Sequence, residues 1–404
     1  MSASSNAPNI SRRIYGPTSL FSARSPSALS PAVSARTWRV RLTSSSVLSP
    51  PTLILLSLIP PTRVALVLPA PLLTAPVRLA LVLLALVRLA LALLALALLA
   101  LVPRLMDQPP DALSAALASH LTGWPGLAAA GVVACDRSGD HPRTQVLATA
   151  GPLADRFDWA SVTKLLVCLA SLVALEEGSV TLDDAAGPPG STLAHLLAHA
   201  SGLPFQGDQP IARPATNRIY SNTGIEMAAA HLEARTGMSF SDYLSSGVLE
   251  PLGMRSTVLK GSPAHGASSP LEDLLLLASE MLAPSLVSAE TTRRAAAVAF
   301  PGLAGVLPGF GRQTPCDWGL GPEIRGHKTP HWSGRSNSPA TFGHFGQSGS
   351  LLWVDPTADL ALVALSSTPF GPWAKEAWPA LSDAVLAGAG ADRTGRERHR
   401  TSGD

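Results

Sequence analysis

Two polar residues with complementary chemistry interrupt an apolar stretch of this chain. In "FDWASVTKLL", Ser161 and Lys164 stand three positions apart among Leu, Val and Ala. A spacing of three on a helix places both side chains on one face. A serine hydroxyl becomes a strong nucleophile when a base takes its proton, and a lysine can be that base if burial lowers its pKa. The stretch therefore predicts a nucleophilic serine with a lysine base.

The same two residues also have an ordinary structural explanation. Ser161 could cap the N-terminus of a helix, and the aliphatic stem of Lys164 could lie along the helix surface. Because serine and lysine are common residues, a spacing of three is weakly specific on its own. Further motifs are needed to decide between the two readings.

Two such motifs follow along the chain. "RIYSNTG" places Tyr220 two positions before Asn222, and "FGHFGQSGSLLWVDP" places His344 two positions before Gly346, ahead of an apolar strand. The S-x-x-K, Y-x-N and H-x-G motifs, in this order, resemble those of the serine β-lactamase and penicillin-binding protein superfamily. Within that superfamily, the motifs most resemble those of the class C branch, which includes related esterases and D-amino-acid peptidases. "LLAHASGLP", "LEEGSVTLDD" and "LEPLGM" are similar to that family's patterns too, and the resemblance covers residues 127–386.

The resemblance implies a role for each matching residue. Ser161 would be the acylated nucleophile, Lys164 its proton acceptor, and Tyr220 the group that relays a proton to the leaving group. Asn222 would hydrogen-bond the amide or acyl side chain of the substrate.

The third motif would complete the site. Gly346 would let the substrate lie against its strand without a side chain in the way. The backbone N–H groups of Ser161 and Gln347 would hold the oxyanion that develops on attack. His344 would contact the substrate.

That motif departs from the β-lactamase pattern. His344 stands where those enzymes have the Lys of K-T-G, and Phe345 replaces the Thr. An imidazole near neutral pH cannot hold a substrate carboxylate as an ammonium group does. The departure therefore favours esters, amides or less acidic peptides over antibiotics. Lys328-Thr329 is no substitute, because Pro330 follows, cannot donate to a sheet ladder and stands where the motif needs Gly.

Metal and cofactor chemistry find no support. His195 and His199 have the spacing of a zinc-protease motif, but the stretch between them lacks the catalytic Glu. Cys135, Cys168 and Cys316 lack CxxC spacing, so they predict neither a disulfide framework nor a zinc site. We expect no metal and no cofactor.

Charge divides the chain into two unlike parts. From Met1 to Met106 there are ten Arg but no Asp, Glu or Lys, whereas residues 107–404 carry a net charge of about −8. Residues 1–105 therefore form a low-complexity extension. The basic residues are dispersed and lack interleaved aromatic residues, so they give no support to a nucleic-acid partner.

An apolar Leu/Ala repeat lies within this extension, where residues 78–87 recur almost unchanged at 88–97. Leu79–Val102 is long enough to cross a bilayer, which predicts a single-pass membrane anchor. The alternative is that translation begins at Met106, which opens "MDQPPDALSAALASHL", and that the protein is cytoplasmic.

Residues 106–390 are expected to form one catalytic domain. Apolar patterning predicts strands at 127–135, 145–150, 322–327, 350–354 and 360–365, helices at 111–121, 161–177 and 373–386, and helical pieces between 191 and 254. Strands at both ends with helices between them predict an α/β (α+β) fold of the β-lactamase/transpeptidase type, an antiparallel sheet flanked by helices with an inserted helical region. Residues 391–404 are expected to be a disordered tail.

Together these features predict a serine hydrolase that forms an acyl-enzyme with a small-molecule ester, amide or peptide. A β-lactamase or a D-Ala-D-Ala carboxypeptidase-type enzyme of the cell wall is the first alternative. A catalytically silent binding protein on the same fold is the second, and the intact Ser161, Lys164 and Tyr220 disfavour it.

Overall fold

The computed structural model describes residues 83–84, 86–91, 112–139 and 141–401. The chain divides into two units, residues 1–102 and residues 103–404. In the first unit, residues 83–84 and 86–91 are helical. Most of the predicted span Leu79–Val102 lies outside the described residues, as does Met106. Within the described residues, no helix combines the length and the apolar character that crossing a membrane requires.

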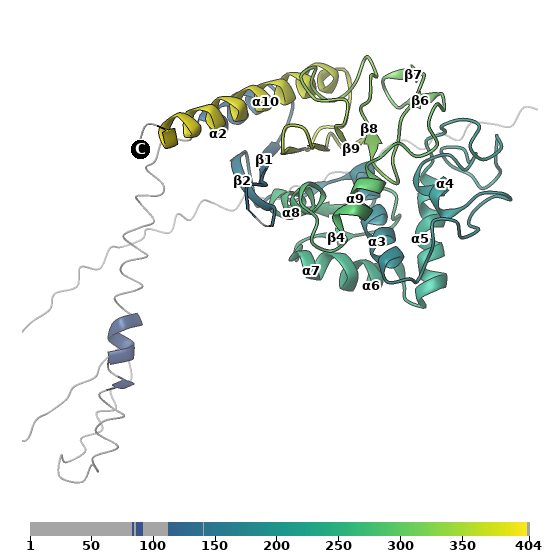
Figure 1. Cartoon of the computed structure of the whole chain (residues 1–404), viewed down its shortest axis with the longest axis horizontal. Helices are drawn as coiled ribbons and strands as arrows, with labels where there is room; N and C mark the ends of the chain where they lie inside the picture. Colours follow the sequence, from purple (N-terminus) through teal and green to yellow (C-terminus); the bar gives the residue numbers. More distant parts are fainter. Residues whose placement is uncertain (1–82, 85, 92–111, 140, 402–404) are drawn as a thin grey trace, which may run out of the picture. The chain divides into compact units, whose positions relative to one another are not determined.

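A six-stranded antiparallel sheet is the centre of the second unit (Figure 1). From one edge to the other, its strands are β2 (Arg143–Ala150), β1 (Ala128–Asp136), β11 (Leu360–Ser366), β10 (Leu351–Asp355), β9 (Phe342–Phe345) and β8 (Glu323–Ile324). The first long strand of the unit therefore pairs with the last, as Ala128↔Ser366 and Ala134↔Leu360 show. This arrangement confirms the predicted antiparallel sheet built from both ends of the domain.

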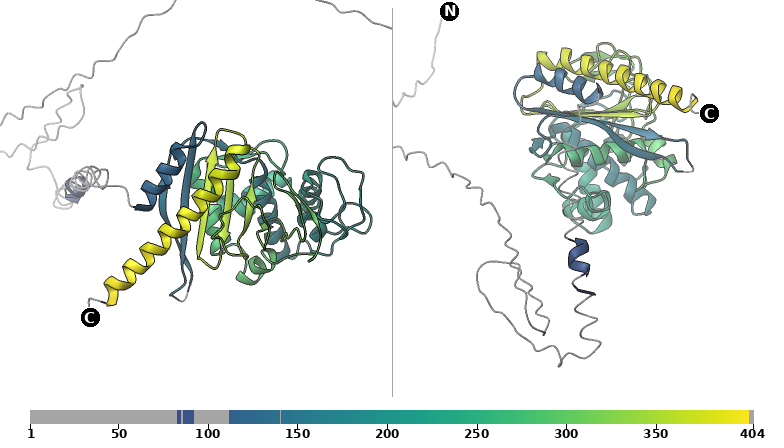
Figure 2. Two further views of the ribbon diagram at one scale, coloured as in Figure 1. Left: turned by 90° about the horizontal axis from the view of Figure 1, so that it is seen from above. Right: turned by 90° about the vertical axis from the view of Figure 1, so that its left-hand side faces the viewer.

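Both faces of the sheet are buried against helices. Helices α2 (Ala112–Thr122) and α10 (Pro372–Thr401) cover one face, and α8 (Leu271–Leu282) packs on the other (Figure 2). Strand β11 shows why its sequence is a continuous apolar run. Leu360, Leu362 and Ala364 belong to the core beneath α2 and α10, and the residues that alternate with them belong to the core on the other side.

The middle of the chain forms the predicted helical region. Its helical elements are α3 (Lys164–Glu176), α4 (Leu193–Leu197), α5 (Asn222–Thr236), α6 (Phe240–Leu244), η3 (Ser245–Leu249), α7 (Glu250–Leu252) and α9 (Ala289–Ala295). Two smaller sheets accompany them, one of β3 (Phe157–Asp158), β5 (Ala267–Ser269) and β4 (Val258–Leu259), the other of β6 (Gly305–Leu307) and β7 (Gly311–Gln313). The short strands of these two sheets have no clear signal in the sequence.

Three predicted elements differ from the structure. The helix expected at 161–177 begins as a 3₁₀ turn, η2 (Ala160–Thr163), before α3. The strand expected at 322–327 is reduced to β8, because the chain turns away at Gly326 in a left-handed conformation (φ 53°). The prediction of a disordered tail from residue 391 is wrong up to Thr401, since α10 continues through it. Apart from Gly395, this stretch consists of residues that a helix accommodates, and it lacks Pro.

The burial of strand β11 predicts how a core substitution changes the free energy of unfolding. Leu362 is fully buried in the middle of β11, so Leu362→Ala removes apolar contacts and leaves a cavity. We expect the free energy of unfolding to fall by about 2–5 kcal/mol, measured by denaturant titration. Val146→Ala, at a residue 52% exposed on β2, is the control and should change it by no more than about 0.5 kcal/mol. Equal losses in the two variants would contradict this account of the core.

Candidate active site

The first motif lies where η2 runs into α3. In a 3₁₀ turn, side chains three positions apart stand one above the other. Lys164 Nζ is accordingly 3.1 Å from Ser161 Oγ. Ser161 is partly exposed, whereas Lys164 is completely buried. The candidate nucleophile is therefore accessible to solvent, and its candidate base is enclosed by the protein.

The amine of Lys164 has neutral partners only. Nζ donates to Asn222 Oδ1 at 2.7 Å and to the Ala264 carbonyl at 2.9 Å. Across the described residues, it forms no salt bridge with a carboxylate. Burial lowers the pKa of Lys164 to about 7, and the charge of Glu226 raises it only in part.

These partners fix the direction of a proton transfer. A neutral lysine amine has two N–H groups and one lone pair. The oxygens of Asn222 and Ala264 can only accept, so they take both N–H groups. The lone pair is then left for the Ser161 hydroxyl, which donates to it. The geometry thus orients the neutral amine to receive the serine proton.

The partners of Lys164 are themselves held. Ser262 Oγ donates to the Glu226 carboxylate and accepts from Ala264 N at 3.1 Å. Glu226 thereby fixes the loop that carries the Ala264 carbonyl. Sequence reasoning missed this connection, because a backbone carbonyl leaves no trace in residue type and Glu226 is an ordinary residue for a helix.

A tight contact joins the first and third motifs. Ala160, just before Ser161, has a positive φ of 44°, which is costly for a residue with a Cβ. The carbonyl of Trp159 accepts from Ser350 Oγ at 2.6 Å. A Cβ on Gly346 would lie 2.2 Å from the same carbonyl. Gly346 is therefore required by the close packing of the chain on itself, whereas the sequence-based expectation was room for substrate.

The side chain of Tyr220 stands among aromatic rings. Its centroid lies 4.6 Å from that of His199, 5.7 Å from Trp318 and 5.8 Å from His344. Lys164 Nζ lies 4.8 Å from the same centroid. Burial raises the pKa of Tyr220, and a hydrogen bond with Ser161 opposes that rise. The phenol is therefore neutral and within hydrogen-bonding reach of Ser161.

His344 is buried on β9 and is neutral. Burial lowers its pKa to about 3, and the nearby charge of Lys164 acts in the same direction. Its Nδ1 lies 2.7 Å from the Phe345 carbonyl. Since a carbonyl only accepts, Nδ1 carries the proton and Nε2 is an acceptor. No described residue hydrogen-bonds to Nε2.

The other two predicted residues, Asn222 and Gln347, are held in place by hydrogen bonds within the protein. Asn222 begins α5 and is buried, with its carbonyl oxygen on Lys164. Only its amide N–H groups are left for the predicted contact with substrate. Gln347 is held by Phe370, whose N–H donates to its carbonyl at 2.9 Å and whose carbonyl accepts from its side chain at 3.2 Å. The oxyanion role of the Gln347 N–H stays a prediction.

The residues set aside at the sequence level have structural roles. His199 holds the loop before α5, since its Nδ1 accepts from Ser221 N at 3.2 Å. His195 stacks on Phe300 with centroids 4.3 Å apart. Lys328 is buried in an ion pair with Glu323 at 2.6 Å. In the part of the chain that the structure describes, no group of His, Cys, Asp and Glu could hold a metal ion.

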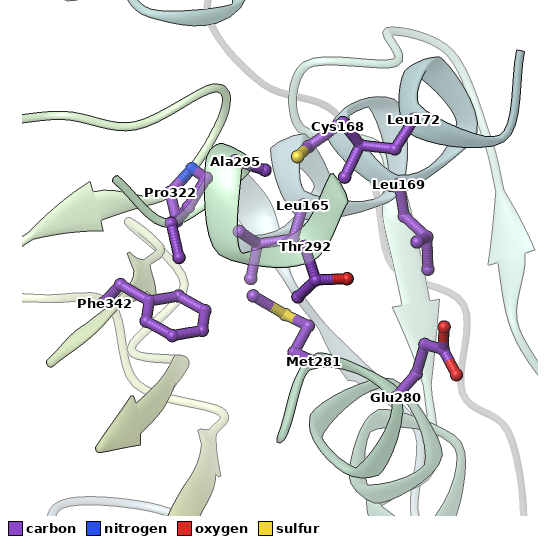
Figure 3. Close-up of a pocket in the computed structure, with 11 residues that line it drawn as sticks. Leu165, Cys168, Leu169, Leu172, Glu280, Met281, Thr292, Ala295, Pro322 and Phe342 are labelled. Atoms are coloured by element: carbon purple, nitrogen blue, oxygen red, sulfur yellow. The ribbon is translucent and has the colours of Figure 1, made fainter. Parts of the chain in front are cut away.

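A small, mostly apolar cavity lies beside α3. Figure 3 shows Leu165, Cys168 and Leu172 of α3 on one side of it and Phe342 and Pro322 on the other. Neither Ser161 nor Lys164 lines it. Burial raises the pKa of Cys168 to about 12, and its Sγ donates to the Leu320 carbonyl at 2.6 Å. The cavity is a packing gap beside α3.

Comparison with known proteins places this fold and site. The model of the Beta-lactamase family matches residues 104–386. The chain therefore belongs to the β-lactamase family, as the three motifs indicate, and its structural neighbours are β-lactamase and penicillin-binding-protein-like serine hydrolases.

Individual relatives differ in how much they share. The crystal structure of a β-lactamase from Mycobacterium bovis is 53% identical, with a TM-score of 0.64 over 67% of this chain and 98% of that chain. EstCE1, described as a hydrolase with promiscuous acyltransferase activity, is 17% identical (TM-score 0.55, over 68% of this chain and 99% of that chain) and shares the fold. Penicillin-binding protein 4* of Bacillus subtilis (strain 168) is 29% identical over 134 residues, 25% of this chain and 30% of that protein. The match thus spans under a third of that relative.

The buried amine predicts how stability depends on pH. The pKa of Lys164 is 10.5 in its ordinary state and about 7 in the fold. Between these values the unfolded chain binds more protons, so the cost of burying the charged amine is relieved as the pH rises. We expect the unfolding free energy of the wild type, relative to Lys164→Met, to rise from about pH 7 toward pH 10. Lys375→Met, at an exposed lysine, should run parallel to the wild type. A pH-independent gap to Lys164→Met would contradict the lowered pKa.

Proposed function

We propose that this protein is a serine hydrolase that forms an acyl-enzyme through Ser161. The observation that carries the proposal is the 3.1 Å contact between Ser161 Oγ and the Lys164 amine, whose pKa burial lowers to about 7. A base with a pKa near the working pH is available in its neutral form and still accepts a proton readily. Family membership supports the same class of reaction.

The steps follow from the atoms present. Neutral Lys164 takes the Ser161 proton while Oγ attacks the substrate carbonyl, and the N–H groups of Ser161 and Gln347 hold the oxyanion. As the intermediate collapses, the bond to the leaving group breaks. Tyr220 passes the proton from Lys164 to the leaving atom, and its neutral phenol suits that relay. Water then attacks the acyl-enzyme by the same route and releases the acid.

The neutral His344 decides which substrates we propose. An uncharged imidazole with an acceptor nitrogen can receive a hydrogen bond but offers no cation to a carboxylate. The proposed substrates are therefore esters, amides or peptides that lack a carboxylate at this position. The name of the Mycobacterium bovis relative favours a second candidate function, β-lactam hydrolysis. A D-Ala-D-Ala carboxypeptidase would need the missing cation more than either.

Labelling with a fluorophosphonate tests the nucleophile and the base together. The probe should add to Ser161, found by peptide mass spectrometry, at a rate that rises with pH through about 7 because only neutral Lys164 accepts the proton. Lys164→Ala should slow labelling by about two orders of magnitude or more, whereas Lys375→Ala should match the wild type. An adduct that persists in Ser161→Ala would overturn the assignment.

A side-by-side panel tests the substrate class. We expect p-nitrophenyl acetate to be hydrolysed with a higher kcat/KM than nitrocefin or a D-Ala-D-Ala peptide, because neutral His344 cannot pair with the carboxylates of the latter two. Initial rates at pH 7.5 or so, with Ser161→Ala as the blank, give the ranking. Nitrocefin turnover above ester turnover would instead establish the β-lactamase reading.

A further inference from the structure

A surface groove is lined by Tyr220 but not by Ser161. Tyr220 forms part of its lining, in a hollow of about 480 Å³ between the loop before α5 and the β6–β7 hairpin. We infer, on the basis of the proposed function, that this groove binds the leaving-group half of the substrate. We infer further that this half is an apolar chain ending in an anionic group.

The position of Tyr220 determines which half of the substrate lies in the groove. A phenol that protonates the leaving atom must lie next to it, so whatever is attached to that atom continues along the surface that starts at Tyr220.

The groove exposes large apolar side chains to solvent. Phe205 is 53% exposed, Ile211 69% and Val306 57%, and all three line the hollow. The ring of Phe205 stacks with that of Tyr220 at 6.0 Å between centroids, so the apolar surface is continuous with the catalytic residue. An exposed patch of large apolar side chains that is surrounded by polar residues is typical of a site that binds a ligand or a partner.

The floor of the groove is rigid. Arg218 is buried, and its guanidinium donates to the carbonyls of Cys316, Ala198, Ala299 and Phe300. Its own N–H donates to the Ala304 carbonyl at 2.9 Å. One side chain thus ties the loops on both sides of the groove together. A preformed floor lowers the entropic cost of binding a chain against it.

An exposed arginine without an acidic partner among the described residues lies at the rim of the groove. Arg312 lines the groove, is exposed, and stands directly opposite Val306 across the β6–β7 ladder. Opposite residues of an antiparallel pair share one face. No Asp or Glu lines the groove, and among the described residues Arg312 has no salt-bridge partner. A chain that lies on Val306 therefore brings its end to a guanidinium suited to a carboxylate.

Two ester series test the placement. In the first the acyl group is acetyl and the alcohol grows from ethyl to octyl; in the second the alcohol is p-nitrophenol and the acyl group grows over the same range. We expect kcat/KM to rise about twofold per methylene in the alcohol series, half of what full burial gives, because the groove is open on one side. The acyl series should stay flat.

Variants of the groove test its apolar lining and its arginine separately. Ile211→Asp should flatten the alcohol series, while Val146→Asp, at another exposed apolar residue, on β2 and outside the groove, should leave the slope unchanged. The wild type should prefer 6-acetoxyhexanoate to hexyl acetate by about tenfold, the gain of one charge-assisted hydrogen-bonded pair. Arg312→Gln should abolish this preference, and Arg255→Gln, an exposed arginine elsewhere, should preserve it.

The outcomes distinguish the two levels of the proposal. If no acetate is hydrolysed and Ser161 takes no fluorophosphonate label, the proposed function itself fails. If acetates are hydrolysed but the alcohol series is flat, or the acyl series rises in its place, the groove does not hold the leaving group and this inference is wrong. An alcohol series that rises without a preference for the carboxylate would refute the anionic end.

Discussion

A lysine amine buried without a carboxylate is the constraint around which this structure is arranged. Each of its three contacts is with a neutral oxygen, from Ser161, Asn222 and Ala264. A paired lysine would be more stable as a cation and useless as a base. The protein therefore accepts an unfavourable burial and satisfies the amine with hydrogen bonds alone. The carboxylate of Glu226 acts through Ser262, near enough to hold the Ala264 loop and too indirect to restore the ordinary pKa.

The elements that meet at this amine come from distant parts of the chain, so their assembly depends on the sheet. Strand β9 brings His344 to the site because β9 pairs with β10, β10 with β11, and β11 with β1 at the centre of the domain. The hydrogen bond from Ser350 to the Trp159 carbonyl then locks the third motif onto the turn before Ser161. Gly346 permits that approach. The geometry of the candidate site and the packing of the core thus depend on each other.

Sequence reasoning recovered what depends on periodicity and on motif, and little of what depends on backbone approach. The long strands have strong patterns, and their positions are confirmed to within two residues. The helix of Lys164 is confirmed too, although its first turn is a 3₁₀ turn. The Ala264 carbonyl and the strained Ala160 carry no signal in residue type. The close packing of Gly346 on the Trp159 carbonyl was not anticipated, because a sequence does not show which backbone will lie against a glycine. The sequence indicated that His344 is less charged than a lysine, but the size of its pKa shift depends on burial, which only the structure shows.

The two ends of the site have opposite electrostatic character, and this determines how a substrate can lie in it. On β9, a neutral His344 offers only an acceptor nitrogen, so a carboxylate there would be desolvated without compensation. Beyond Tyr220, the exposed Arg312 borders an apolar groove with no acidic lining. A substrate with an anionic group therefore gains by turning that group away from His344 and toward Arg312. If Ser161 acts as proposed, the histidine of the third motif and the arginine of the β6–β7 hairpin would together place the recognised charge on the leaving-group side of the scissile bond.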